Sequence, residues 1–429
     1  MEADVKKVRF PYGKSFLEHT FDGSIDLRII DSAINSLEVE SSPESLVEAA
    51  LASPVGTESL SDLAKDKKRI TIIASDHTRP VPSRVIMPAM LREIRKGNPD
   101  ADITILIATG CHRGTTIAEL ESKFGSEIVE SERIVVHDCD DTEHLRNIGK
   151  LPSGGDCILN TIALDADLLV AEGFIEPHFF AGFSGGRKSV LPGVASRSTV
   201  LANHCSEFID HPNARTGILE GNPIHEDMLW AARQAKLAFV VNVVLDESKR
   251  VIFASAGHPE AAHSAGVEFL SSLCEVSAEP ADIVITTNGG YPLDQNVYQA
   301  VKGMTAGEAA VRKGGVIIMC AASSDGIGGE HFERQLADEA DIEKTAAEFL
   351  ARGRSGTVPD QWQTQIMIRV LRHASVIYVS EIDDETVRKL HMIPARSVGE
   401  AFEMAKKIVG CEAPTVNAIP DGVSVIVKS

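Results

Sequence analysis

RITIIASDHTRPVPSRVIMPAMLREIRKGNPDADITILIATGCHR occupies residues 69–113, and this stretch indicates an α/β fold. Arg69–Ala74 is a largely β-branched apolar run that stops at a polar cluster, and Ile103–Ala108 is a second apolar run with the same kind of ending. Between them, Ser83–Arg95 carries apolar residues at helical spacing. Near-continuous apolar strands that alternate with helices are typical of a parallel sheet covered on both faces.

The same alternation continues along the chain, breaks near residues 272–280, and starts again after this point. A length of 429 residues fits two or three domains. We expect two α/β lobes on mainly parallel sheets with a cleft between them, an N-terminal domain over 1–275 and a C-terminal domain over 276–429. The further predicted strands are 134–136, 168–171, 239–244, 251–253, 281–286, 316–320, 376–379 and 423–427, and the further predicted helices are 259–273, 343–350, 363–371 and 398–408.

The composition excludes several classes of protein. The chain has 42 Lys and Arg against 62 Asp and Glu, a formal charge of −20, so its surface repels nucleic acid and anionic lipid. An anionic substrate therefore needs a locally basic pocket. The 7 cysteines form no Cys-x-x-Cys pair, which argues against a disulfide framework and a zinc ribbon. With no secretory signal and no long apolar run, we expect a cytoplasmic protein without a membrane span.

Polar clusters follow the two strands of the opening stretch, where α/β sheets place functional residues. Arg79 can hold a carboxylate or phosphate through two parallel hydrogen bonds, and Asp76 can cap the next helix or hold a hydroxyl group. A helix cap beside a surface arginine is the plainer explanation of this cluster. His112 and Arg113 form the second cluster, and a single histidine at such a place is more often structural than catalytic.

The segment from Glu176 to Gly193 is the densest in chemistry-bearing residues. Its glycines let the backbone fold closely around an anion, and Lys188 adds a positive charge. The segment nearly spells a nucleotide-binding P-loop, but that motif requires glycine immediately before the lysine, and Arg187 occupies this position. A nucleotide-triphosphatase is therefore a poor interpretation. A structural glycine-rich turn is the plainer alternative.

Three further places carry candidate residues. His204 offers an imidazole, a common ligand for nickel, copper or zinc, although one histidine is not a site by itself. Tyr298 and Lys302 stand four residues apart on one face of a predicted helix, with Gln299 beside Tyr298. Trp362 lies at a predicted helix start, where core packing is the default role.

Taken in order along the chain, these clusters resemble the nickel-dependent lactate racemase family. The resemblance spans most of the chain, and its Gly-Arg-Lys-Ser segment is specific. The matching positions are Asp76-x-x-Arg79-Pro80, Thr109-Gly110-x-His112-Arg113, Glu176-Pro177-His178, Gly186-Arg187-Lys188-Ser189-x-Leu191-Pro192-Gly193, His204, Tyr298-Gln299-x-x-Lys302 and Trp362.

The resemblance implies a racemase of small 2-hydroxy acids, most simply lactate, that uses a nickel-pincer nucleotide. This cofactor is pyridinium-3-thioamide-5-thiocarboxylic acid mononucleotide, which holds nickel through sulfur, carbon and sulfur donors and depends on separate maturation enzymes. By matching position, Lys188 would carry the covalent thioamide link, with Asp76 and Gly186 also at the cofactor. His204 would supply the fourth nickel ligand.

The remaining matched residues receive roles toward the substrate. The resemblance implies that His112 and His178 are the two catalytic bases and that Arg79 and Lys302 hold the substrate carboxylate. Tyr298, Gln299 and Trp362 would shape the pocket.

This assignment makes chemical sense. Removing the α-proton of a 2-hydroxy acid is hard because the adjacent carboxylate resists more negative charge. Removing hydride while a base takes the hydroxyl proton gives a neutral ketone, and a pyridinium is a natural hydride acceptor. Return of the hydride to the opposite face inverts the carbon. Each enantiomer places its hydroxyl group on a different side, so two bases are wanted, and histidine titrates near working pH.

Three alternatives stay open beside this interpretation. A larger 2-hydroxy acid, such as malate or a sugar acid, is the alternative within the family. A nickel-binding or cofactor-binding protein without turnover would not need two histidine clusters and two cations. A nicotinamide dehydrogenase would need Gly-x-Gly-x-x-Gly after a strand, and the sequence has no such segment. The sequence leaves a homo-oligomer open.

Overall fold

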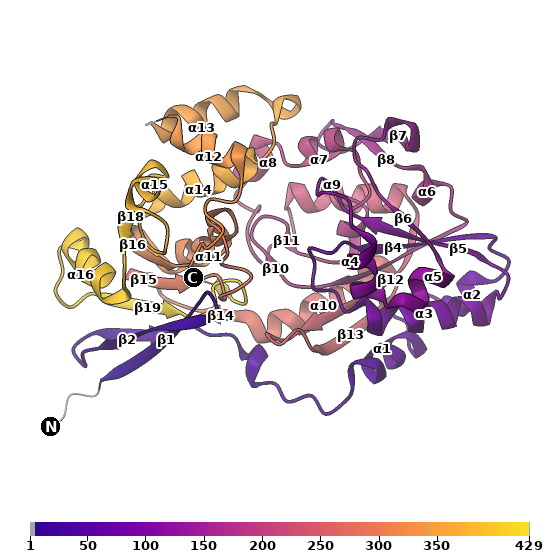
Figure 1. Ribbon diagram of the computed structural model, residues 1–429, viewed down its shortest axis with the longest axis horizontal. Helices are drawn as coiled ribbons and strands as arrows, with labels where there is room; N and C mark the ends of the chain where they lie inside the picture. Colours follow the sequence, from indigo (N-terminus) through magenta and orange to yellow (C-terminus); the bar gives the residue numbers. More distant parts are fainter. Residues whose placement is uncertain (1–4, 340, 429) are drawn as a thin grey trace. The chain divides into compact units, whose positions relative to one another are not determined.

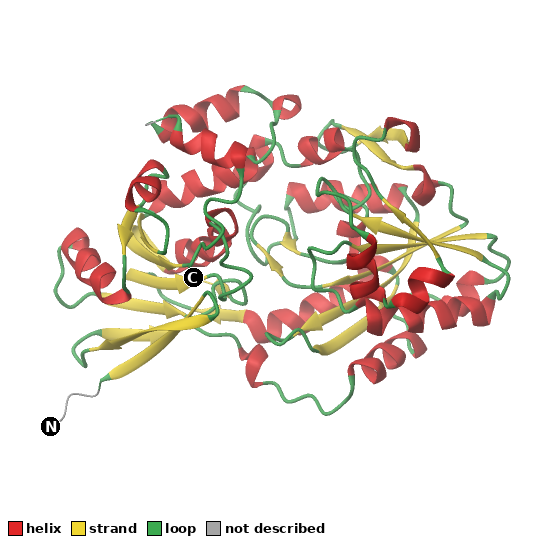
Figure 2. Ribbon diagram, in the orientation of Figure 1, coloured by secondary structure: helices red, strands yellow, loops and turns green. Residues whose placement is uncertain are grey.

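The computed structural model describes residues 5–339 and 341–428. Its contacts divide the chain into two compact units. Ile34–Leu273 forms one unit, here called the continuous unit. The residues up to Ala33 and those from Cys274 onward form the other, here called the split unit. Figure 1 colours these elements along the chain, and Figure 2 shows helices packed on the strands in each of them.

The continuous unit is built on a six-stranded sheet with the strand order β13-β12-β9-β4-β5-β6. All neighbours pair in parallel except β13, which runs antiparallel to β12. The middle residues of these strands are almost all apolar, as in Ile70–Ala74 and Ile103–Ile107, because both faces of the sheet are covered. The strands are β4 (Arg69–Ser75), β5 (Asp102–Ala108), β6 (Arg133–Val136), β9 (Leu168–Phe174), β12 (Leu237–Leu245) and β13 (Val251–Gly257).

The helices of the continuous unit begin at residues that suit helix starts. The Ser42 side chain accepts a hydrogen bond from Ser45 N ahead of α1, and Thr116 and Glu119 form a capping box at α4. Two small hairpins complete the unit, β7 (Leu145–Lys150) with β8 (Asp156–Asn160) and β10 (Pro177–His178) with β11 (Gly182–Phe183). The helices are α1 (Pro43–Ala52), α2 (Leu60–Ala64), α3 (Ser83–Gly97), α4 (Ile117–Phe124), α5 (Ser126–Ser131), α6 (Thr161–Leu164), α7 (Arg197–Asn203), α8 (Ser206–Asp210), α9 (Pro223–Gln234) and α10 (Pro259–Cys274).

The split unit has a second six-stranded sheet, in which all neighbours pair in parallel in the order β18-β17-β16-β15-β19-β3. Its strands are β3 (Asp26–Ile29), β15 (Ala281–Thr287), β16 (Val311–Cys320), β17 (Ser375–Val379), β18 (Ile393–Ala395) and β19 (Thr415–Ile419). The helices are α11 (Val297–Ala310), α12 (Glu330–Ala337), α13 (Ile342–Ala351), α14 (Gln361–His373), α15 (Asp384–Lys389) and α16 (Val398–Val409), and a short pair joins β14 (Glu275–Ser277) to β20 (Ile426–Lys428).

The first strands of the chain belong to the split unit, which differs from the expected division of the sequence. The hairpin of β1 (Lys6–Tyr12) and β2 (Ser15–Phe21) buries Val8 and Phe10 in the core of this unit, and β3 pairs with β19. Figure 1 draws this hairpin in indigo and β19, the partner of β3, in yellow. The expected N-terminal domain over 1–275 had assigned these residues to the other unit. Short strands that are half polar do not indicate which strands they pair with. The other boundary falls at Cys274, inside the expected region 272–280.

The expected α/β class with mainly parallel sheets is confirmed. The predicted strands and helices of the opening stretch are present, each within two residues of its expected bounds. The last strand is observed at Ile426–Lys428, three residues later than its predicted start at 423. Among the described residues, the structure has no helix whose length and apolar character would let it cross a membrane.

Candidate active site

Most of the candidate residues lie where the central strands of the continuous unit end. The chain builds this sheet outward from β4 through β5 to β6, and then returns to add β9 and β12 on the other side of β4. Ligands of such sheets bind beyond the carboxyl ends of the strands, at the point where the strand order reverses. Asp76 follows β4, His112 follows β5, and His178 and Lys188 follow β9.

Asp76 and His112 form a close pair. The Nδ1 atom of His112 lies 2.8 Å from Oδ2 of Asp76, whose side chain is almost fully buried. Burial acts to raise the pKa of Asp76, but the hydrogen bond from His112 and the nearby charges lower it overall, so the carboxyl stays ionised at neutral pH. A carboxylate at Nδ1 fixes the proton there and leaves Nε2 of His112 as the acceptor.

Thr78 links Arg79 to this pair. Its hydroxyl donates to Oδ1 of Asp76 at 2.7 Å and in turn accepts from Nη1 of Arg79 at 3.1 Å. The expected helix-capping role of Asp76 is not observed, because α3 begins at Ser83 and its N-cap residue, Pro82, makes no side-chain capping bond. The three predicted residues Asp76, Arg79 and His112 are therefore brought together.

His178 lies on the small hairpin of β10 and β11, opposite Gly182. The backbone N–H of Ala181 donates to Nδ1 of His178 at 3.3 Å. Its ring stacks on Phe179, with the ring centres 5.1 Å apart. The hairpin and the stacked ring therefore hold this imidazole in one orientation.

Phe180 gathers three of the predicted residues around its ring. Its centre lies 4.5 Å from that of His178 and 5.1 Å from that of His204, and the Lys188 ammonium lies 5.8 Å from it. Both histidines meet the phenyl ring edge to face. The sequence places Phe180 in this segment but does not show that its ring would contact residues as distant in the chain as His178 and His204.

His204 has the properties of a metal ligand. It follows α7 and is 6% exposed, and its Nδ1 lies 2.9 Å from the carbonyl oxygen of Val200. Burial, with the nearby charge of Lys188, lowers the pKa of His204 to about 3, so the ring is neutral. A neutral imidazole whose Nδ1–H is anchored on a carbonyl presents the Nε2 lone pair to a metal. These observations fit a ligand to a borderline metal such as nickel.

The glycines just before Lys188 are needed for the close packing of this segment. Gly185 and Gly186 have φ angles of 78° and 51°, in the left-handed region. A Cβ at Gly186 would lie 2.9 Å from the ring of His263, and one at Gly185 would lie 2.6 Å from Oδ1 of Asn242. That Asn242 oxygen accepts the N–H of Gly186 at 3.0 Å. The backbone just before Lys188 is thus fixed in a tight cradle.

Arg187 supports this cradle from inside the protein. It is 3% exposed, and its guanidinium donates to the carbonyl oxygens of Ala181, Ser184 and Gly185. It also lines a pocket of about 120 Å³ together with His225 and His263, and none of the other candidate residues lines this pocket. The arginine that broke the P-loop pattern therefore has a role of its own, which is to hold the Lys188 segment in shape.

The other four predicted residues belong to the split unit. Tyr298, Gln299 and Lys302 lie on α11, as expected, and Trp362 is the second residue of α14. The Tyr298 hydroxyl donates to Oδ1 of Asp360 at 3.2 Å, two residues before Trp362, so the two helix starts are joined. Gln299 donates its backbone N–H to the side chain of Asn296, the N-cap residue of α11.

Sequence reasoning did not identify several supporting residues. Thr78, Phe180 and Arg187 lie in segments that the sequence had indicated as candidates for the site. Their position in these segments was the available sign that they support it. Asn242 and His263 come from β12 and α10, and nothing in their local sequence indicates that they pack on the Lys188 segment. Only the fold brings them there.

These features define an α/β protein in which His112, His178 and Lys188 follow strands of one mainly parallel sheet. Residues 12–217 match the family model of the lactate racemase N-terminal domain, and residues 276–427 match that of the lactate racemase C-terminal domain. The chain therefore belongs to the lactate racemase family, and racemases are isomerases. The resemblance inferred from sequence motifs is confirmed.

The relatives match over nearly their whole length. The chain is 55% identical to the lactate racemase of Thermoanaerobacterium thermosaccharolyticum over 422 residues, which cover 98% of this chain and 99% of the relative. It is 50% identical to the lactate racemase of Lactiplantibacillus plantarum over the same length. The structure matches that of the lactate racemase apoprotein from Thermoanaerobacterium thermosaccharolyticum with a TM-score of 0.95 and 54% identity, over 99% of this chain and 100% of that one.

Proposed function

We propose that this protein interconverts the two enantiomers of lactate by transient oxidation to the keto acid. The observation that carries the proposal is the convergence of Lys188, His178 and His204 on Phe180, in a chain of this family. A tether, a base and a metal ligand are the parts that the proposed chemistry requires of the protein.

The donor set fits a nickel-pincer nucleotide. His204 would hold the nickel through Nε2, Lys188 would carry the covalent link, and Asp76 and Gly186 would contact the nucleotide. The tight backbone at Gly185 and Gly186 supports this role because it fixes the start of the Lys188 side chain. When bound, the cofactor would supply the hydride acceptor that no side chain provides.

His112 would act as a general base toward the substrate hydroxyl. Asp76 holds the Nδ1 proton of His112, so Nε2 is the atom that accepts the proton. The buried carboxylate also stabilises the imidazolium that forms, as expected for a carboxylate that orients a catalytic histidine. His178 would serve the other enantiomer.

The substrate carboxylate requires a fixed cation because the whole protein carries a charge of −20. Arg79 would provide it at the continuous unit, where Thr78 ties its guanidinium to the Asp76–His112 pair. Lys302, Tyr298, Gln299 and Trp362 would also contribute to substrate binding. These four roles rest on the matching motif positions.

The proposal includes a small anionic 2-hydroxy acid as substrate, maturation enzymes as partners and the cytoplasm as the place of action. The alternatives are a larger 2-hydroxy acid and a cofactor-binding protein without turnover. Bulky Tyr298 and Trp362 favour a small acid.

The test is a racemisation assay on protein produced together with its maturation enzymes. Enantiopure D-lactate, L-lactate, D-malate and L-malate are incubated separately, and a chiral separation follows each product. Racemisation of lactate alone, in both directions, supports the proposal. Faster turnover of malate would move the substrate to the larger class, and no turnover of any acid by nickel-loaded protein would favour a binding protein.

A further inference from the structure

The side chain of Asp360 is directed at Tyr298 rather than at its own helix. Asp360 is the N-cap residue of α14, yet its carboxylate makes no capping bond to this helix. It accepts instead the hydrogen bond from the Tyr298 hydroxyl at 3.2 Å. The backbone of Asp360 is left-handed, with a φ angle of 62°, a conformation that aspartate adopts more readily than most residues. The turn into α14 therefore carries the carboxylate to the phenol.

The ring of Tyr298 is held on several sides. Phe332 of α12 meets it edge to face, with the ring centres 5.4 Å apart. A Cβ at Gly329 would lie 3.0 Å from Cδ2 of the ring and 3.5 Å from Oδ2 of Asp360. The side-chain amide of Gln363, on the first turn of α14, donates to the Tyr298 carbonyl oxygen. The phenol oxygen and the carboxylate thus keep one arrangement relative to each other.

Tyr298 and Asp360 together offer hydrogen-bond acceptors to a small molecule beside them. Both side chains are half-buried, so such a molecule can reach them. A phenol has one O–H group, and that of Tyr298 is donated to Asp360. The lone pairs of the phenol oxygen and of the carboxylate accept from a hydroxyl group, whereas a second carboxylate has no proton to donate to them. The pair therefore favours a hydroxyl group and disfavours a carboxylate.

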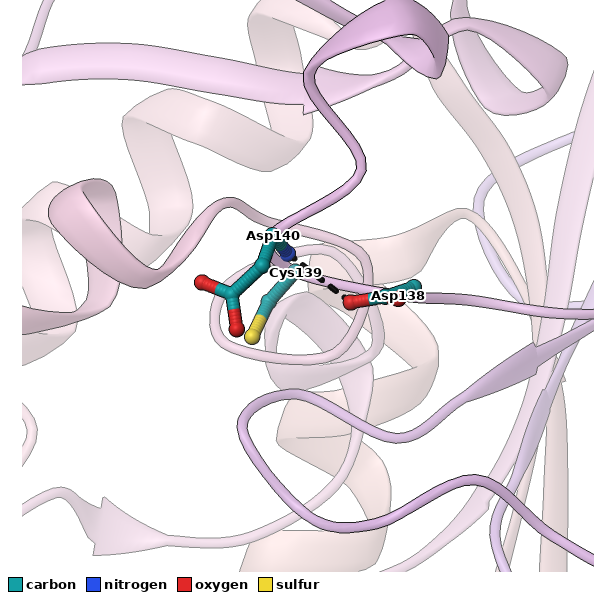
Figure 3. A group of neighbouring side chains, drawn as sticks. All are labelled: Asp138, Cys139 and Asp140. Carbon is teal, nitrogen blue, oxygen red and sulfur yellow. Dashed lines mark hydrogen bonds between the residues drawn. The ribbon is translucent and has the colours of Figure 1, made fainter.

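Carboxylates elsewhere in the chain are bound by a cation or a backbone N–H. Figure 3 shows Asp138, Cys139 and Asp140, whose ligand atoms lie within 4.8 Å of one another. The Arg197 guanidinium binds Asp140 at 2.7 Å, and Asp138 accepts the N–H of Asp140 at 2.9 Å. These bonds account for both carboxylates within the fold.

The charge of Asp360 is not compensated in this way. On the same two helices that carry Tyr298 and follow Asp360, Glu308 of α11 is bound by Arg369 of α14 at 2.7 Å. Over residues 5–339 and 341–428, no lysine or arginine forms an ion pair with Asp360. A like charge placed beside an uncompensated carboxylate is repelled by it.

We propose that Asp360 determines the substrate specificity of this protein by excluding 2-hydroxy acids that carry a second carboxylate. Lys302 lies one helical turn beyond Tyr298 on the same face of α11 and would hold the single carboxylate of a small acid. The second carboxylate of a dicarboxylic acid would meet the fixed acceptors of Tyr298 and Asp360. The inference rests on the proposed function, because it takes Tyr298 and Lys302 as residues of the substrate pocket.

The first experiment compares lactate with malate in the variant Asp360→Asn, made as cofactor-loaded full chain. Asparagine keeps an oxygen that accepts from the Tyr298 hydroxyl and also tolerates the left-handed backbone, so the substitution changes mainly the charge. We expect the ratio of kcat/KM for malate to that for lactate to rise about tenfold or more, with kcat for lactate within about threefold of wild type. Where malate turnover is too slow to follow, its inhibition constant against lactate gives the same comparison.

The matched control is Asp338→Asn, the same change at an exposed aspartate of the split unit, which should keep the wild-type ratio. Asp360→Gly suits the left-handed backbone but releases the Tyr298 hydroxyl, so it should raise both the KM for lactate and the malate-to-lactate ratio. If Asp360 only supported the fold, Asp360→Asn would change both acids equally. An unchanged ratio in Asp360→Asn, with lactate racemisation intact, would overturn the proposal.

Two results for the wild-type protein separate this inference from the proposed function. Faster turnover of malate than of lactate would overturn the role of Asp360 and would move the substrate to the larger class. Absence of racemisation of any acid would count against the proposed function. Calorimetric binding of lactate and of malate would then decide on Asp360, since an equal preference in wild type and Asp360→Asn would overturn its role.

Discussion

The His112 imidazole, whose side chain is 43% exposed, is bound at 2.8 Å by the carboxylate of Asp76, whose side chain is 1% exposed. An accessible ring is thus held by a buried carboxylate. The strand order places the two residues together, because β4 and β5 are parallel neighbours and each residue follows the end of its strand. This arrangement makes Asp76 a positioning residue for His112 as well as a proposed contact of the cofactor.

We expect Asp76→Asn to lower kcat by about 10²–10⁴-fold while the protein stays folded. The amide has no charge to stabilise the imidazolium, and its N–H can donate a hydrogen bond to Nδ1, which would leave the ring proton on Nε2, the wrong tautomer for a base that accepts there. The measurement is kcat as a function of pH, with Thr78→Val as the matched control. Thr78 also contacts Asp76, at 2.7 Å, but its loss leaves the carboxylate in place, so its effect should be much smaller. Equal losses in the two variants would contradict the positioning role.

The two proposed bases can be separated by half-reactions. In a single turnover with cofactor-loaded protein, His112→Ala and His178→Ala should each oxidise one enantiomer of lactate normally and the other about 10²–10⁴-fold more slowly. Net racemisation should fail in both variants because each full inversion uses both bases. The measurement is the rate of keto-acid formation from each enantiomer. If both variants oxidised both enantiomers at the wild-type rate, neither histidine would be a base.

Lys188→Ala should remove both the covalent adduct and the activity. The measurement is the intact mass of protein made with its maturation enzymes, followed by identification of the peptide that carries residue 188. Lys188→Arg keeps the positive charge but not the primary amine, so it should lose the adduct as well. Lys150→Ala is the control, since Lys150 is an exposed lysine paired with Asp156 at 2.8 Å. An adduct of nucleotide size in Lys188→Ala would place the tether elsewhere.

His204→Ala should lower the nickel content of the loaded protein, with activity falling in proportion. Deleting one ligand of a four-ligand site weakens metal binding even where the other donors remain. His211→Ala is the matched control, because the Nδ1 of His211 accepts from the backbone of Asn213 at 3.2 Å and serves a local turn. Nickel is measured by elemental analysis after gel filtration. Nickel loss in His211→Ala alone would reassign the ligand.

Asp282→Asn should destabilise the split unit, and the loss of unfolding free energy should be smaller at acidic pH. Asp282 joins three strands, because its carboxylate accepts from Arg312 at 2.6 Å and from the backbone and hydroxyl of Thr415 at 2.9 Å. The hydrogen bond from Arg312 is the main reason that its pKa is lowered. A lowered pKa in the folded state means that this stabilisation is complete above the usual aspartate range and is lost as the pH falls through the lowered value.

We expect the variant to lose about 1–3 kcal/mol of unfolding free energy at neutral pH and the difference to shrink below about pH 4. The measurement is urea unfolding followed by the fluorescence of Trp362 in a Trp230→Phe background, because the two tryptophans lie in different units. Asp338→Asn is the control at an exposed aspartate. A difference that grew in acid would contradict the sign of the pKa shift.

The sequence predicted the continuous sheet well because its strands are buried on both faces. Continuous apolar runs such as Ile70–Ala74 and Ile103–Ala108 indicate by themselves that the strand is buried on both faces. The apolar residues at helical spacing between these runs predict a connecting helix, which limits the topology to a few choices. Asp76, Arg79 and His112 were found through their place at the strand ends, whereas the resemblance to the family implied the roles of His178, Lys188 and His204. The same reasoning placed Tyr298 and Lys302 on a helix and Trp362 at a helix start.

The rest depended on tertiary contacts that local sequence does not encode. The strands β1 and β2 alternate buried and exposed residues over only 7 positions each, and β3 has 4 residues, too few for a clear periodic signal. Asp76 looked like a helix cap because its pairing with His112 depends on the neighbouring strand. In the sequence, Arg187 is only a departure from the P-loop motif. Its structural role was not predicted because the carbonyl oxygens to which it donates come together only in the folded segment.

The pairing of β3 with β19 has a consequence for synthesis on the ribosome. Residues 26–29 emerge long before their partner strand, residues 415–418. The continuous unit can therefore fold while the chain is still growing, whereas the first strands must wait for the last ones. Until those later strands emerge, the nascent hairpin of β1 and β2 leaves Val8 and Phe10 exposed to water, which makes this hairpin a segment that a chaperone would protect.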